Sequence, residues 1–202
     1  PFFGGELFFG IYKAGVVSYY KEKSTWVSPS FTNVFHFDIL EGKDNVLYEP
    51  DKVLIPESMA RKLFGNETAL DKQLKRSGNN DYTIGGVYRD FPRNSSLQNC
   101  IYIAIPENEN INNWGNWNYN VYIRLDTHGI ADSTLLNDNF RQSLPKDLNI
   151  DFSKGSLQFT QLPDLHYTTD VLYDYSPKSS RQTIAVLFAI AFVIVIIAGV
   201  NF

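Results

Sequence analysis

The 202-residue sequence contains a single cysteine, Cys100, and therefore no pair that could form an intramolecular disulfide. A chain of this length buries enough apolar surface to fold without cross-links, which excludes a small disulfide-stabilised scaffold. The sequence also lacks an excess of positive charge, because its formal net charge is −4. Without a basic surface there is no electrostatic basis for binding a polyanion, so we expect no nucleic acid among its partners.

The sequence also lacks the common motifs for nucleotide, metal and nucleophile sites. Neither GxxxxGK[ST] nor GxGxxG occurs, so any ATP that drives this protein would bind to another chain. The histidines, His36, His128 and His166, are far apart, and no HExxH or CxxC is present to form a zinc site. No GxSxG segment occurs either. We therefore predict no cofactor, no metal and no catalytic residue.

The most informative segment is the last one, TIAVLFAIAFVIVIIAGVNF, which covers residues 183–202 without a charged side chain. A helix of ~20 apolar residues, rising ~1.5 Å per residue, spans the ~30 Å hydrocarbon core of a bilayer. A buried core helix is seldom so long and so uniformly apolar. We predict a transmembrane helix over residues 181–202. Because the chain starts at Pro1 and stops inside the apolar run, we expect a fragment with this helix truncated.

The preceding 180 residues mix strand and helix patterns, and 15% of the whole sequence is aromatic, which favours a sheet-rich α+β body. Residues 53–55 form an apolar strand that leads into a helix over residues 57–64, which Gly65 ends. Residues 82–90 form another strand, in which Gly85 and Gly86 indicate a bulge or a close backbone approach. Further strands are predicted at 16–20 and 25–27, around a charged turn at 21–23, and at 97–105, 119–125 and 157–162. Further helices are predicted at 31–35 and 130–144.

Two groups of residues are candidates for a site. Trp114, Trp117 and Tyr119 lie in the asparagine-rich segment INNWGNWNYN, and such aromatic and amide groups bind sugars. The alternative is a loop packed on its own domain or on a protein partner, because protein interfaces use the same residues. We favour the second interpretation and name these three residues as the candidate partner or ligand surface. Asp164 and His166 would share one face of a strand, and we interpret them as a surface pair rather than a site.

Four stretches of the sequence occur together in a characteristic order. They are VSPSFTNVFHFDILEG at 27–42, VLIPESMARKLFGNETALDKQL at 53–74, YTIGGVYRDFPRNSSLQ at 82–98, and DLHYTTD at 164–170 ahead of an apolar helix ending in GVNF. In this order and spacing the chain resembles the MacB/FtsX-type ABC transporter permeases, and in particular their MacB-like periplasmic core domain. The matching motifs are structural, so the resemblance transfers no catalytic residue.

The resemblance implies a fold and a place in the cell. The fold is α+β, with a mixed two-lobed extracytoplasmic domain over residues 1–180, one lobe built of strand–helix–strand units and the other mostly β. The transmembrane helix over residues 181–202 follows it. The resemblance also implies a non-catalytic permease subunit of the bacterial inner membrane whose main domain is periplasmic.

The partners implied by the resemblance are a cytoplasmic ABC ATPase, a second permease subunit in a homodimer or heterodimer, and a periplasmic adaptor or cargo protein. Such a subunit would couple ATP hydrolysis to export or to mechanical signalling across the membrane. The alternative from the residues alone is a membrane-anchored glycan-binding or sensory module, which would use Trp114, Trp117 and Tyr119.

Overall fold

The computed structural model describes residues 5–13, 15–76, 81–106, 119–125, 133–143, 156–167 and 179–201. The chain divides into two compact units, Pro1–Arg124 and Leu125–Phe202. The described part of the first unit contains strands β1 (Gly5–Lys13), β2 (Val16–Val27), β3 (Ile39–Gly42), β4 (Lys52–Pro56), β5 (Gln73–Arg76), β6 (Asp81–Tyr88) and β7 (Ile101–Ala104). It also contains helices α1 (Phe31–Val34) and α2 (Glu57–Phe64) and a 3₁₀ turn, Val46–Tyr48. The mixture of sheet and helices confirms the predicted α+β class.

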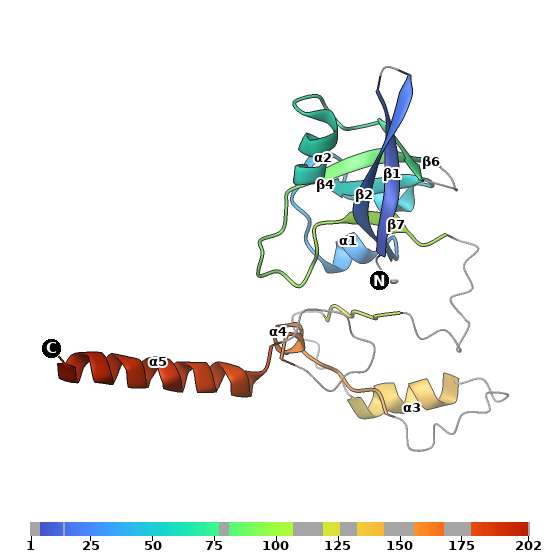
Figure 1. Cartoon of the computed structure of the whole chain (residues 1–202). Coiled ribbons are helices and arrows are strands. Elements are labelled where there is room, and N and C mark those ends of the chain that lie inside the picture. The colour runs from blue at the N-terminus through green and yellow to red at the C-terminus, as the bar shows by residue number, and fades with distance from the viewer. Residues whose placement is uncertain are drawn as a thin grey trace. The chain divides into compact units, whose positions relative to one another are not determined.

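The strands of the first unit form one sheet in the order β3-β6-β4-β7-β2-β1-β5, and β5 pairs with β6 as well. This last pairing closes the sheet on itself, so that β6 is hydrogen-bonded to β3, β4 and β5. The pairs β2–β7 and β4–β6 are parallel, whereas the other pairs are antiparallel. Figure 1 shows β1 and β2 as a long blue hairpin, with α2 beside β4.

The predicted turn at residues 21–23 is wrong, because β2 runs through it without a break. Strand β1 supplies a hydrogen-bonding partner along this whole stretch, with Phe8 opposite Lys21 and Glu6 opposite Lys23. Both lysines are exposed, and Lys21 forms an ion pair with Glu6. The two lysines of the charged run therefore face solvent from a continuous strand, and the chain does not reverse there.

Alternating side chains of the strands divide between two hydrophobic clusters. Val53 and Ile55 of β4 join one cluster with Met59 and Leu63 of α2. Leu54, between them, points to the other cluster, where it meets an aromatic group that includes Tyr102. This period of two is what a strand buried on both faces requires.

Strand β6 contains the irregularity that its glycines predict. The register with β4 shifts between Val53, opposite Ile84, and Leu54, opposite Gly86, so that Gly85 is the extra residue of a bulge. A Cβ atom on Gly85 would lie 2.3 Å from Cγ2 of Val46. In a regular strand, residues an odd number of positions apart point to opposite faces of the sheet. Ile84 and Val87 are three positions apart and yet belong to the same cluster, because the bulge shifts the alternation of side chains between the two faces.

Helix α2 is also confirmed. Its amphipathic pattern buries Met59, Ala60 and Leu63, and Gly65 ends it with a positive φ of 66°. Helix α1 confirms the short helical turn predicted from residue 31. Strand β7 is shorter than predicted and begins at Ile101.

The described part of the second unit consists of helices α3 (Ser133–Ser143), α4 (Leu162–Leu165) and α5 (Arg181–Asn201). The predicted helix at 130–144 is thus confirmed by α3. The strand predicted at 157–162 is wrong, because these residues lead into α4, where Pro163 stands in the first turn. The strand predicted at 119–125 is also wrong, since Tyr122 packs edge-on against Phe35, 5.0 Å between ring centroids, and pairs with no described strand.

Helix α5 fulfils the length and composition expected of a membrane span. Its stretch Arg181–Val200 has 20 residues and a mean hydropathy of 3.0, with none of it buried, and it is the one candidate in the described part of the chain. Its N-terminus is capped by Ser180, whose Oγ accepts a hydrogen bond from the backbone N–H of Thr183 at 3.4 Å. The division of the chain at residue 180 stays a prediction.

Candidate functional site

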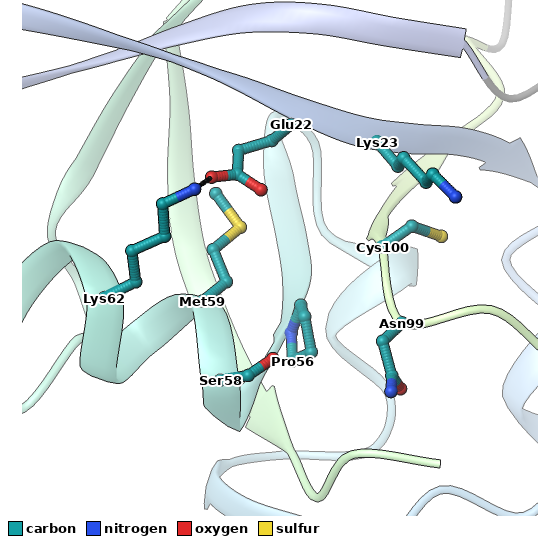
Figure 2. Close-up of a pocket in the computed structure, with 8 residues that line it drawn as sticks. All are labelled: Glu22, Lys23, Pro56, Ser58, Met59, Lys62, Asn99 and Cys100. Atoms are coloured by element: carbon teal, nitrogen blue, oxygen red, sulfur yellow. Dashed lines mark hydrogen bonds and ion pairs between the residues drawn. The ribbon is translucent and has the colours of Figure 1, made fainter. Parts of the chain in front are cut away.

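A shallow pocket of about 250 Å³ lies in the first unit, where the start of α2 approaches β2 and the residues before β7. Figure 2 shows the residues that line it. They are Glu22, Lys23, Pro56, Ser58, Met59, Lys62, Asn99 and Cys100. Segments distant in the sequence therefore meet here, which makes the pocket a product of the sheet topology.

An ion pair holds one side of this pocket together. Nζ of Lys62, from α2, lies 2.6 Å from Oε1 of Glu22, from β2, as the dashed line in Figure 2 marks. The same ammonium group lies 5.9 Å from the centroid of the Tyr20 ring. The Glu22 side chain is mostly covered, with 18% exposure, so solvent screens this pair less than a fully exposed one. The contact joins α2 to the long hairpin.

The polar groups on the other side of the pocket already have partners. Oδ1 of Asp90 accepts a hydrogen bond from the backbone N–H of Ser58 at 3.1 Å, in the first turn of α2. The side-chain amide of Asn99 forms two hydrogen bonds with the backbone of Phe91. Its Oδ1 accepts from the Phe91 N–H at 2.8 Å, and its Nδ2 donates to the Phe91 carbonyl at 3.1 Å. A carboxylate at the N-terminus of a helix stabilises the positive end of the helix dipole. The geometry thus fixes the loop that leads into β7.

Cys100 lies at the buried end of the pocket. Burial raises the pKa of its thiol to about 11, so the sulfur is protonated at neutral pH and is a poor nucleophile. The remaining lining is apolar at Met59 and Pro56 and cationic at Lys23 and Lys62. Because Lys62 is paired with Glu22, this open pocket offers a ligand little beyond apolar contact and the Lys23 ammonium group. In the part of the chain that the structure describes, no three His, Cys, Asp or Glu side chains come together to hold a metal ion.

The candidate surface predicted from the sequence is only partly visible. Trp114 and Trp117 lie outside the described residues, whereas Tyr119 is half-buried. Tyr122, three residues further on, packs on Phe35 of the aromatic cluster and so anchors the end of this segment to the first unit. The role of Trp114, Trp117 and Tyr119 as a partner or ligand surface stays a prediction.

Asp164 and His166 do not share a strand. Asp164 lies in α4, His166 directly follows this helix, and the Asp164 carboxylate forms an ion pair with the guanidinium of Arg181. The His166 ring packs edge-on against Tyr167, with 5.2 Å between ring centroids. The structure therefore gives the Asp164 carboxylate a structural partner at the start of α5.

Sequence reasoning missed the pocket of Figure 2. Its residues come from β2, from the end of β4, from α2 and from the loop before β7, and each segment has the local sequence pattern of an ordinary strand, helix or turn. The only local signal was the strand–helix unit at residues 53–64, because the N-terminus of such a helix lies at the edge of the sheet.

Comparison with known proteins gives consistent results. A profile of the MacB-like periplasmic core domain matches residues 9–134. Among solved structures, the chain is similar to a domain of a Porphyromonas gingivalis protein assigned as a permease, with 29% identity and a TM-score of 0.56, covering 68% of this chain and 64% of that one. No curated protein matches the sequence.

Two further solved structures resemble it more distantly. The periplasmic region of MacB from Actinobacillus actinomycetemcomitans shares 16% identity, with a TM-score of 0.39 over 52% of this chain and 46% of that one. The extracellular domain of the ABC-type transporter YknZ from Gram-positive bacteria shares 19% identity, with a TM-score of 0.37 over 51% and 50%. The chain thus covers less than two thirds of the length of each of the three structures.

Proposed function

Because the chain belongs to the family of MacB-like periplasmic core domains, found in ABC-type permeases, we propose that it couples ATP hydrolysis by a partner ATPase to export or to periplasmic mechanotransmission. The observation that carries this proposal is the profile match over residues 9–134. The likeness to a domain of a protein assigned as a permease supports it. The candidate membrane helix α5 supports attachment to the bilayer.

The family works as a membrane component together with a cytoplasmic ATPase. We place this chain in the bacterial inner membrane with its first unit in the periplasm, as one subunit of a permease homodimer or heterodimer. A periplasmic adaptor or cargo protein completes the assembly. In this scheme the chain itself performs no chemistry, and ATP is hydrolysed by the partner.

The first unit suits a part that transmits movement. Its sheet closes through the β5–β6 pairing, and both faces of β4 and β7 are buried. Close-packed protein interiors resist compression and transmit strain to neighbouring elements. A movement applied at one edge of such a body is carried across it and is not absorbed within it.

The test uses the full-length permease reconstituted with its ATPase in proteoliposomes. A spin label at Val16→Cys, an exposed position at the turn of the β1–β2 hairpin, reports the distance between two subunits by pulsed electron resonance. We expect this distance to change between the nucleotide-free state and the ATP state of a hydrolysis-deficient ATPase. An unchanged distance, with ATP bound, would contradict the proposed coupling.

The location is tested with the same variant in intact cells. A membrane-impermeant maleimide should label Val16→Cys once the outer membrane is permeabilised, without disruption of the inner membrane. Labelling only after the inner membrane is broken would place the first unit in the cytoplasm and refute the proposed topology.

A further inference from the structure

The segment ahead of α5 exposes apolar side chains. Phe159, Leu162 and Tyr167 are 43%, 50% and 38% exposed. Other described residues, Val121, Ile123 and Leu125, are exposed apolar side chains as well, so exposure alone does not distinguish this segment. What distinguishes it is contact with the first residue of a helix that fits a membrane, through Asp164 and Tyr167.

This segment is held against the first residue of α5. The Arg181 guanidinium forms an ion pair with Asp164, and its Cζ lies 4.9 Å from the centroid of the Tyr167 ring. The backbone N–H of Ser179 donates to the His166 carbonyl at 2.9 Å. Figure 1 shows α4 next to the first turn of α5, in agreement with these contacts.

Arg181 is the first residue of the candidate membrane span. The stretch Arg181–Val200 has 20 residues, and at ~1.5 Å per residue it matches the ~30 Å hydrocarbon core. A guanidinium at the end of such a helix extends toward the headgroups, in a layer ~5–8 Å thick on each side of the core. Side chains in direct contact with that guanidinium lie within the same layer.

We propose that residues 159–167 lie in the headgroup layer of the bilayer that α5 enters, with Phe159, Leu162 and Tyr167 against lipid. The proposal rests on the membrane attachment in the proposed function. Tyrosine is enriched at this depth, because its ring is apolar and its hydroxyl can stay hydrated. The ion pair with Arg181 offsets the charge of Asp164, which lowers the cost of placing that carboxylate near the hydrocarbon.

The experiment measures the depth of a spin label on the full-length permease in vesicles of phosphatidylethanolamine and phosphatidylglycerol. The label is placed at Leu162→Cys, with Ile190→Cys as the hydrocarbon reference and Val16→Cys as the aqueous reference, all exposed positions. The native Cys100 is buried and can be left in place. Depth is read from the ratio of collision rates with oxygen and with a water-soluble nickel chelate.

We expect the ratio at position 162 to lie between the two references and well above that at position 16. A value equal to the aqueous reference, with position 190 in hydrocarbon, would overturn this inference alone. Protection of position 162 from both reagents would show a protein contact, with the first unit or a second copy, and would also overturn it. An aqueous value at position 190 would refute both this inference and the membrane attachment.

The contact with Arg181 makes a second test possible. Arg181→Gln removes the ion pair and should shift the label at position 162 toward the aqueous reference. Arg181→Lys keeps the charge and should preserve most of the depth. Equal depth in both variants and in the parent would show that the apolar side chains alone hold the segment in the headgroup layer, and would overturn the role given to Arg181.

Discussion

The hydroxyl group of Tyr88 is hydrogen-bonded to both backbone groups of Cys100. It donates to the Cys100 carbonyl at 2.8 Å and accepts from the Cys100 N–H at 2.9 Å. The Tyr88 side chain, from β6, thereby supplies hydrogen-bond partners for both backbone groups of Cys100, the residue that leads into β7. Both residues are buried. These bonds replace strand pairing at the point where the ladder of β7 begins.

Removing that hydroxyl should therefore be costly. Tyr88→Phe leaves a buried N–H and a buried carbonyl without their partner, and we expect the free energy of unfolding to fall by about 2 kcal/mol. Urea unfolding followed by circular dichroism measures the change. Tyr19→Phe, at an exposed position of β2, serves as the control and should change it by less than ~0.5 kcal/mol. Equal effects of the two substitutions would contradict the role of Tyr88.

The bulge at Gly85 leaves no room for a side chain. In Gly85→Ala the new Cβ would lie 2.3 Å from Cγ2 of Val46 and 2.9 Å from Cδ of Lys52, and we expect a loss of about 2–3 kcal/mol in the free energy of unfolding. Gly5→Ala, which meets nothing within 4 Å, is the matched control. The double variant with Val46→Ala removes the clashing methyl group and should cost less than the sum of the single variants. If the two effects on the free energy of unfolding simply add, the clash with Val46 does not cause the destabilisation by Gly85→Ala.

The buried thiol predicts a dependence of stability on alkaline pH. The pKa of Cys100 is raised to about 11 in the folded protein, against an ordinary value near ~8.5, so the unfolded chain loses this proton first. The free energy of unfolding should therefore fall as pH rises through this window, by at most ~1.4 kcal/mol per pH unit. In Cys100→Ala the fall between about pH 8.5 and 10 should be smaller. If the parent and Cys100→Ala lose stability identically with rising pH, the Cys100 thiol is not the group responsible.

The same thiol should resist alkylation. At pH 7.5 iodoacetamide should modify Cys100 much more slowly in the folded protein than in urea, because both burial and the raised pKa suppress the thiolate. Mass spectrometry of timed samples gives the two rates. Similar rates would mean that the pocket of Figure 2 opens freely to solvent.

Substitutions in the aromatic segment INNWGNWNYN can distinguish a permease subunit from a glycan-binding module. If Trp114 and Trp117 belong to a protein contact, a glycan array should show no saturable binding by the full chain. Sugar binding that is lost in Trp114→Ala or Trp117→Ala, and kept in the exposed control Tyr12→Ala, would favour the glycan-binding alternative.

Local patterns predicted those parts of the fold in which neighbouring residues determine the outcome. The strand–helix unit ending at Gly65, the bulge at Gly85 and the apolar helix α5 are of this kind. Prediction failed where contact with a segment distant in the sequence determines the secondary structure. The charged residues 21–23 stay in a strand because β1 lies beside them, and the four-residue strand β5 closes the sheet although nothing in QLKR indicates a closing strand.

The candidate site was less predictable for the same reason. Lys62 meets Glu22 across 40 positions of sequence, and no periodicity relates them. The contact between Asp164 and Arg181 also joins two segments that were predicted separately, as a strand and as a membrane helix. The role of Trp114, Trp117 and Tyr119 was predicted from local composition alone and stays a prediction, because composition does not determine the geometry of a site.

The three-way pairing of β6 has a kinetic consequence. Its backbone is bonded to β5 near its start, to β3 near its end and to β4 along the other side, so no fraying movement at an edge can release it. We therefore expect the paired, buried amides of β6, such as those of Val87 and Tyr88, to exchange with deuterium more slowly than those at exposed strand ends. The exchange rate of these amides thus reports opening of the closed sheet, whereas Val16, at the exposed start of β2, should exchange by local opening.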